Sequence, residues 1–283
     1  MVRAFVLLVM AMAIPLAAVG QATEHQRIGV EKQTAWELTV ESGTALRAYA
    51  VGELDAFLVE AYAALELLLS RTWSMSATMP LSARVLAGSD VSSPAASGIG
   101  DASLSLGWTG RAGDSRLGIT ATVVGPTGAW EPYEVPGGPL ATGSGRWSAG
   151  LSVSAARILD PVVLGLNLGY TAGLPRAERF GTSWEPGTVS LGLGVTEVLN
   201  DSVGYSIRLG QSLVLPTVVD GVADIDGLSY GVKASLELFV TKDDFTARIG
   251  FTKGLGTDAG PGTVSLTLSY RFEPRKAEGE DSP

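Results

Sequence analysis

The sequence predicts an all-β fold, a single transmembrane antiparallel up-and-down β-barrel of about twelve strands. Three observations predict it: a recurring two-residue alternation of apolar and polar residues, a secretion signal, and short turns that alternate with longer connections. The alternation is clearest in the run Val264 to Phe272, where every second side chain is apolar and the others are Ser, Thr or Arg. Such a strand shows one face to lipid and the other to a polar lumen.

The N-terminal segment 1–22 matches a secretory signal peptide. Arg3 precedes an apolar block from Phe5 to Ala18, and small residues follow, so cleavage is expected after Gly20 or Ala22. A membrane anchor is the alternative, but the block is short for a helical span. The remaining chain has no other uncharged run of helix length, which argues against a helical membrane protein.

Composition narrows the function classes. The 283 residues carry a net charge of -9, with no cysteine, one histidine and 36 glycines. An acidic chain with scattered Lys and Arg offers no nucleic-acid surface. Without cysteine there is neither a disulfide nor a thiolate metal site, as suits an envelope protein. A hydrophobic content of 46% fits a wall with one lipid-facing side.

Turn chemistry divides the chain into hairpins. The short turns are rich in Asp, Asn, Gly and Pro, which tight turns need, and we expect them in the periplasm. The longer, Gly- and Pro-rich connections are expected outside the cell. The short turns are 112–115, 159–161, 199–202 and 241–244, and the longer connections are 86–97, 125–144, 174–187, 216–226 and 255–262.

The segment Leu54 to Leu69 is ambiguous. Its odd-numbered residues from Phe57 to Leu69 are apolar, as in a strand, but Leu54, Leu58, Tyr62, Leu65 and Leu69 also form a helical stripe, and Ala, Leu and Glu favour helices. We predict a strand, because bacterial single-chain barrels have an even number of strands with both termini in the periplasm.

Aromatic residues are predicted to form two belts at the membrane interfaces. Strand directions place one group near the short turns and the other near the long loops. The first group is Trp36, Trp108, Tyr205, Phe245, Tyr270 and Phe272, and the second is Trp147, Tyr170, Tyr230 and Phe251.

The barrel is expected to occupy residues 34–272 in the bacterial outer membrane. The polar segment 23–33 is expected either to hang in the periplasm or to enter the lumen as a plug. Residues 273–283 are charged and lack alternation, so they are expected to form a periplasmic tail. Tyr270 and Phe272 then constitute the signal that the barrel-assembly machinery reads.

Several short motifs resemble the meta-pathway phenol-degradation family of outer-membrane transporters. The resemblance spans about Pro80 to Phe272 and rests on the order of the motifs. It implies a barrel and the uptake of aromatic or other hydrophobic compounds, and it assigns no catalytic or binding residue. The motifs are Gly98-Ile99-Gly100-Asp101, Gly125-Pro126-Thr127-Gly128, Ala141 to Trp147, Leu159-Asp160-Pro161, Tyr170 to Pro175 and Ser269-Tyr270-Arg271-Phe272.

An enzyme is not expected. Barrel hydrolases rely on histidine, and a serine needs an adjacent base to become a nucleophile. The one histidine, His25, lies in the polar segment before any strand, where a solvated tail residue is the simpler interpretation.

No cofactor is expected either. The outer-loop acids Glu131, Glu134, Asp220, Asp224 and Asp226 could gather Ca²⁺, but solvated loop charges are the preferred interpretation. The glycines around Gly100 precede no helix and therefore form no phosphate loop.

The lumen-facing positions favour a passive channel for small, hydrophobic or aromatic solutes. Many are glycine, which leaves room inside a barrel of this size, although glycines also relieve strand coiling. The alternative is a structural or adhesin-like surface barrel without transport. Strand parity points Arg208, Lys233, Glu237 and Arg248 inward as one mostly basic patch, Glu60 and Glu66 inward as an acidic counterpart, and Arg271 inward near the C-terminus. The inward glycines are Gly118, Gly150, Gly165, Gly169, Gly192, Gly194, Gly231 and Gly250.

Overall fold

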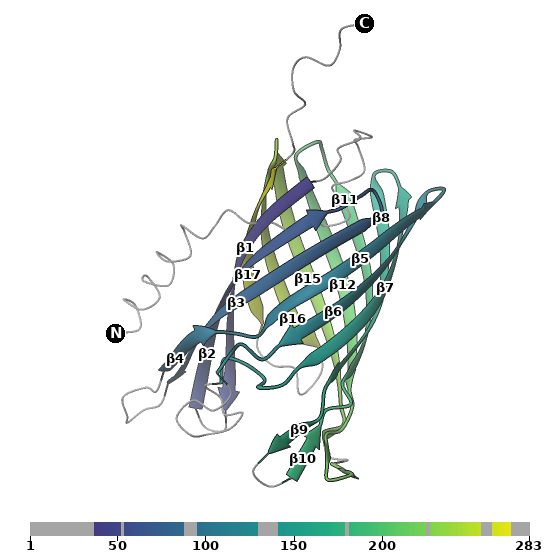
Figure 1. The fold of residues 1–283 in the computed structure, drawn as a ribbon. Coiled ribbons are helices and arrows are strands. Elements are labelled where there is room, and N and C mark those ends of the chain that lie inside the picture. The colour runs from purple at the N-terminus through teal and green to yellow at the C-terminus, as the bar shows by residue number, and fades with distance from the viewer. Residues whose placement is uncertain are drawn as a thin grey trace, which may run out of the picture.

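The computed structural model describes residues 37–51, 54–87, 95–129, 141–178, 181–224, 227–255 and 262–272. These residues form a closed 12-stranded antiparallel β-barrel (Figure 1). The predicted fold class and strand number are confirmed. The barrel strands are β1 (Glu37–Val51), β2 (Leu54–Leu68), β3 (Trp73–Ala87), β5 (Ala102–Ala112), β6 (Ser115–Gly125), β7 (Ser148–Leu159), β8 (Val162–Gly173), β11 (Thr188–Val198), β12 (Val203–Val214), β15 (Ser229–Lys242), β16 (Phe245–Leu255) and β17 (Thr263–Phe272).

Neighbouring strands in the ring follow the chain order. The ring closes where the first and last strands pair: Leu38 of β1 lies opposite Phe272 of β17, and the register continues to Arg47 opposite Thr263. Antiparallel closure satisfies every backbone group between strands, which is what a bilayer requires of a spanning sheet.

Residues Leu54–Leu68 are a strand, as predicted, and the helical alternative is wrong. Leu65 on the outward side is half exposed, while Tyr62 and Ala64 lie opposite the inward-facing Gly43 and Glu41 of β1. The apolar stripe at helical spacing arises from the Ala- and Leu-rich composition of the segment. Because the segment pairs with β1 on one edge and with β3 on the other, it forms a strand.

The outer surface is apolar and exposed, as a lipid-facing wall must be. Leu104, Leu151, Leu168, Leu236 and Ile249, from different strands, are between 45% and 59% exposed although the chain has a closed interior. This surface on a closed barrel is that of a bacterial outer-membrane protein. None of the described segments forms a helix long and apolar enough to span a membrane.

The two ends of the barrel differ. One end, hereafter the turn end, carries the short connections such as Gly113–Asp114 between β5 and β6 and Asp243–Asp244 between β15 and β16. The other, the loop end, carries the long connections. Two of these contain strands that the sequence did not predict: β9 (Arg176–Glu178) and β10 (Gly181–Trp184), and β13 (Val218–Val219) and β14 (Val222–Ala223), which form a second sheet. Figure 1 shows β9 and β10 beyond the lower rim of the barrel.

The chain passes through the motif Gly98-Ile99-Gly100-Asp101 between two separate strands. Strand β4 (Ala95–Ile99) pairs with the C-terminal half of β3, at the loop end, and β5 begins after Gly100 and Asp101 and pairs with the N-terminal half of β3. The predicted segments 1–22, 23–33 and 273–283, and with them His25 and Trp36, lie outside the described residues and stay predictions.

Candidate functional site: the lumen cavity

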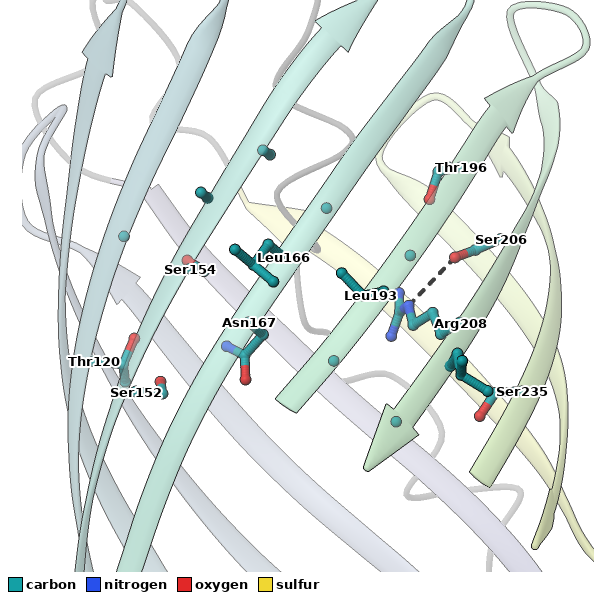
Figure 2. Close-up of a pocket in the computed structure, with 18 of the residues that line it drawn as sticks. Thr120, Ser152, Ser154, Leu166, Asn167, Leu193, Thr196, Ser206, Arg208 and Ser235 are labelled. Atoms are coloured by element: carbon teal, nitrogen blue, oxygen red, sulfur yellow. Dashed lines mark hydrogen bonds between the residues drawn. The ribbon is translucent and has the colours of Figure 1, made fainter. Parts of the chain in front are cut away.

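The barrel encloses a cavity of about 620 Å³. Its described lining comes mainly from β5, β6, β7, β8, β11 and β12, with contributions from β2, β3, β15 and β16. Serine, threonine, asparagine and glycine dominate the inward positions, and Figure 2 shows several of these side chains on the wall. The inward polar residues are Ser74, Thr109, Thr120, Ser152, Ser154, Asn167, Thr196, Ser206, Ser235 and Thr252.

Four glycines lie side by side on the wall of this cavity and are hereafter called the glycine shelf: Gly165 of β8, Gly192 and Gly194 of β11, and Gly210 of β12. Gly192 pairs with Gly210, and Gly165 pairs with Gly194, in adjacent rows of the sheet. A Cβ atom added at Gly210 would meet nothing within 4 Å, and one at Gly192 would lie 3.8 Å from Cβ of Asn167. Gly192 and Gly210 therefore border open space.

Two cationic side chains, those of Lys233 and Arg208, lie beside the glycine shelf. Lys233 lies directly opposite Gly210, and Arg208 lies directly opposite Gly194. Both are exposed although their strand parity points them inward, because the lumen beside them is hollow. Arg208 donates from Nε to Oγ of Ser206 at 3.3 Å, as Figure 2 shows. Its Nη2 lies 3.8 Å from Oε1 of Glu237, a long and half-exposed ion pair.

The opposite side of the lumen is filled. Glu41 of β1 and Arg248 of β16 form an ion pair at 3.6 Å, with side-chain exposures of 0% and 6%. Tyr62 of β2 covers Gly43, where a Cβ would overlap its ring, and its hydroxyl lies 3.3 Å from that of Thr267. Bulk and charge on this side leave the free volume over the glycine shelf.

The structure therefore divides the charges that strand parity grouped together. Arg208 and Lys233 line the cavity, Glu237 lies beside Arg208, and Arg248 is turned to Glu41 rather than to the other three. The two-residue alternation predicts which side chains of a strand point inward. Which inward charges meet depends also on how far along the barrel axis each one lies.

The remaining predicted lumen residues lie apart. Glu66 is the one carboxylate among the described residues that line the cavity. Glu60 lies opposite Ala45 and Ser82, further toward the loop end. Arg271 lies at the turn end, where its Nε is 3.3 Å from Oε1 of Glu37.

Sequence reasoning missed Asp101, which organises the loop end. Its carboxylate accepts hydrogen bonds from the backbone N–H groups of Gly128 and Ser144, at 3.0 and 2.6 Å, and from the Ser144 hydroxyl at 2.6 Å. The buried Arg146 continues the connection to Glu185 beyond β10, at 3.2 Å. The motifs around Gly100, Gly125 and Ala141 are each visible in the sequence. The structure brings all three together around Asp101.

Within the described ranges no group of three or more His, Asp or Glu side chains could hold a metal ion. Of the loop acids considered for Ca²⁺, Asp220 accepts a hydrogen bond from the backbone N–H of Thr182 at 2.8 Å and so supports the second sheet. Glu131, Glu134 and Asp226 lie outside the described residues.

Comparison with known proteins identifies the fold. No protein-family model and no curated protein sequence matches the chain. Among solved structures, the COG4313 outer membrane channel from Pseudomonas putida F1 is 15% identical with a TM-score of 0.70, over 86% of this chain and 97% of that one. The β domain of the Bordetella autotransporter BrkA is 11% identical with a TM-score of 0.49, over 83% of this chain and 99% of that one.

The CymD monoaromatic hydrocarbon channel is 8% identical with a TM-score of 0.43, over 87% of this chain and 90% of that one. The TM-scores of the BrkA domain and of CymD are below 0.5, which is too low to establish a shared fold. The similarity to the Pseudomonas putida protein shows a shared outer-membrane barrel fold. The resemblance to the meta-pathway phenol-degradation family stays a prediction, since no sequence family supports it.

Proposed function

We propose that this protein is a passive outer-membrane channel for small molecules. The observation that carries the proposal is the hollow, polar cavity inside a closed barrel. Inward side chains such as Asn167, Arg208 and Lys233 remain exposed there, which requires open space in the lumen. The shared fold with a solved outer membrane channel supports the same function.

The described lining is rich in hydroxyl groups. Its hydroxyls have neither a histidine nor a lysine-paired nucleophile geometry among the described residues, and a serine without a base is a weak nucleophile. In the proposed channel, pore-lining groups and pore width decide which solutes pass.

A surface scaffold is the second candidate. The observation that favours it is the sheet of β9, β10, β13 and β14 at the loop end, where Trp184, Val219 and Val222 are exposed. Exposed apolar side chains outside the membrane are a common feature of contact surfaces.

Solute uptake into proteoliposomes separates the two functions. Purified protein, shown to be folded by its heat-modifiable migration, is reconstituted and challenged with neutral solutes of increasing size. A channel lets the smallest solutes enter and excludes larger ones. A folded barrel that admits none of them contradicts the proposal and favours the scaffold.

A further inference from the structure

Two rows of inward residues run across the wall of the cavity. The first row passes from Asn167 through Gly192 and Gly210 to Lys233. The second passes from Gly165 through Gly194 and Arg208 to Ser235. Strands lie about 4.8 Å apart, so Asn167 and Lys233 stand roughly 14 Å apart along the wall, with only glycine between them. The shelf is long enough for a small extended solute.

From this arrangement we propose that the glycine shelf takes small hydroxylated carboxylates, such as sugar acids, with the carboxylate at Lys233 and Arg208. The proposal rests on the channel function and specifies its substrate class. The carboxylate end is set by the two cations, and the hydroxylated body by the Ser, Thr and Asn side chains of the wall.

The cations are available to a ligand. Among the residues that the structure describes, Lys233 has no ion-pair partner. Arg208 shares a long contact with Glu237, and side-chain exposures of 45% and 28% weaken that pair further. A guanidinium and an ammonium on adjacent strands can therefore both donate to one carboxylate.

Gly194 positions the guanidinium. A Cβ atom at this residue would lie 3.3 Å from Cγ of Arg208, so the arginine stem lies against the wall above the glycine. The side chain consequently follows the wall instead of crossing the lumen. This keeps the shelf open between Arg208 and the Asn167 side.

The wall offers hydrogen-bond partners to a hydroxylated body. Asn167 and the hydroxyls of Ser152, Ser154 and Thr120 face the same cavity. An apolar solute would strip water from these groups and return no hydrogen bonds, whereas a polyol replaces that water with its own hydroxyls. These groups, together with the two cations, favour a hydrophilic anion over the hydrophobic or aromatic cargo that the family resemblance implies.

The test compares gluconate with sorbitol, which have the same number of carbons and differ in charge at one end. Uptake of each is measured in proteoliposomes containing the wild type, Lys233→Gln, Arg208→Gln or Lys242→Gln. Lys242 is the matched control, because it lies on the same strand as Lys233 but at the exposed turn end.

The wild type should admit gluconate faster than sorbitol at low ionic strength. Lys233→Gln and Arg208→Gln should each lower gluconate uptake by about threefold, the effect of one partly exposed charge contact, and leave sorbitol uptake unchanged. Lys242→Gln should behave as the wild type.

The failures are distinguishable. Equal uptake of both solutes, unaffected by either cavity variant, overturns the substrate class while leaving the channel in place. Saturable uptake of an aromatic hydrocarbon with neither polyol entering overturns it in favour of apolar cargo. If no solute enters through a folded barrel, the proposed channel function itself fails.

Discussion

Glu41 on β1 and Arg248 on β16 form an ion pair at 3.6 Å that reaches across β17, the strand that closes the barrel. Glu37 and Arg271 join β1 to β17 nearer the turn end, and Tyr62 of β2 contacts Thr267 of β17. Three inward contacts thus connect the first strands to the last ones. They stabilise the seam at which the two ends of the chain meet.

Loss of Glu41 should destabilise the folded barrel. Glu41→Ala leaves the buried guanidinium of Arg248 without its carboxylate, and breaking a buried pair in this way costs about 3 to 5 kcal/mol. The temperature at which the heat-modifiable folded band disappears should fall clearly. Glu37→Ala is the matched control: its pair with Arg271 is partly exposed, so the loss should be about 1 kcal/mol or less. Equal shifts in both variants would refute the distinction.

Phe272 should be the residue that barrel assembly reads, although it is not the last residue of the chain. Its ring is half exposed on the lipid side and packs edge-on against Tyr270, with centroids 4.6 Å apart. Truncation after Phe272 should leave assembly intact, whereas Phe272→Ala should weaken it, as measured by the amount of folded barrel in outer-membrane fractions. Equal assembly of the two variants would exclude this assignment.

Reversing the charges of the shelf should change ion selectivity. With Arg208→Glu and Lys233→Glu together, acidic side chains replace the two cations beside the glycine shelf, and charged linings decide which ions pass a narrow lumen. The reversal potential under a salt gradient should move toward cation preference without loss of the folded band. An unchanged reversal potential in an open channel would remove this wall from the permeation path.

Deleting Thr23 to Gln33 tests whether the polar segment plugs the lumen. The segment carries His25, Arg27, Glu31 and Lys32 and precedes the first strand. A plug predicts higher single-channel conductance in the deletion variant. Conductance equal to that of the wild type would instead support a free periplasmic tail.

The strands, turns and facing of side chains could be predicted because each follows from local sequence. A two-residue period fixes which face of β17 carries Leu266 and which carries Thr267, whatever the rest of the chain does. The turn at Asp243–Asp244 is likewise a local feature, with Asp243 at a φ of 53°. Even the ambiguous segment Leu54–Leu68 was resolved by a rule about strand number.

The contacts inside the lumen could not be predicted in this way. Glu41 and Arg248 are distant in sequence and lie on strands that are not neighbours, so their meeting depends on strand tilt and register around the whole ring. The same reason explains why Asp101 was missed, since its partners Gly128 and Ser144 belong to a long connection without alternation. Strands β9, β10, β13 and β14, which form the second sheet, are too short to show a two-residue period.

Single-channel conductance in planar bilayers tests the central claim most directly, with the wild type compared with Gly210→Leu and Ala234→Leu. Leucine at Gly210 adds bulk to the open shelf, whereas Ala234, opposite Leu209, faces lipid and controls for added volume. The wild type and Ala234→Leu should show equal discrete steps, and Gly210→Leu smaller ones. Electrical silence of the folded wild type, or equal steps in all three proteins, would contradict a permeation path through this cavity.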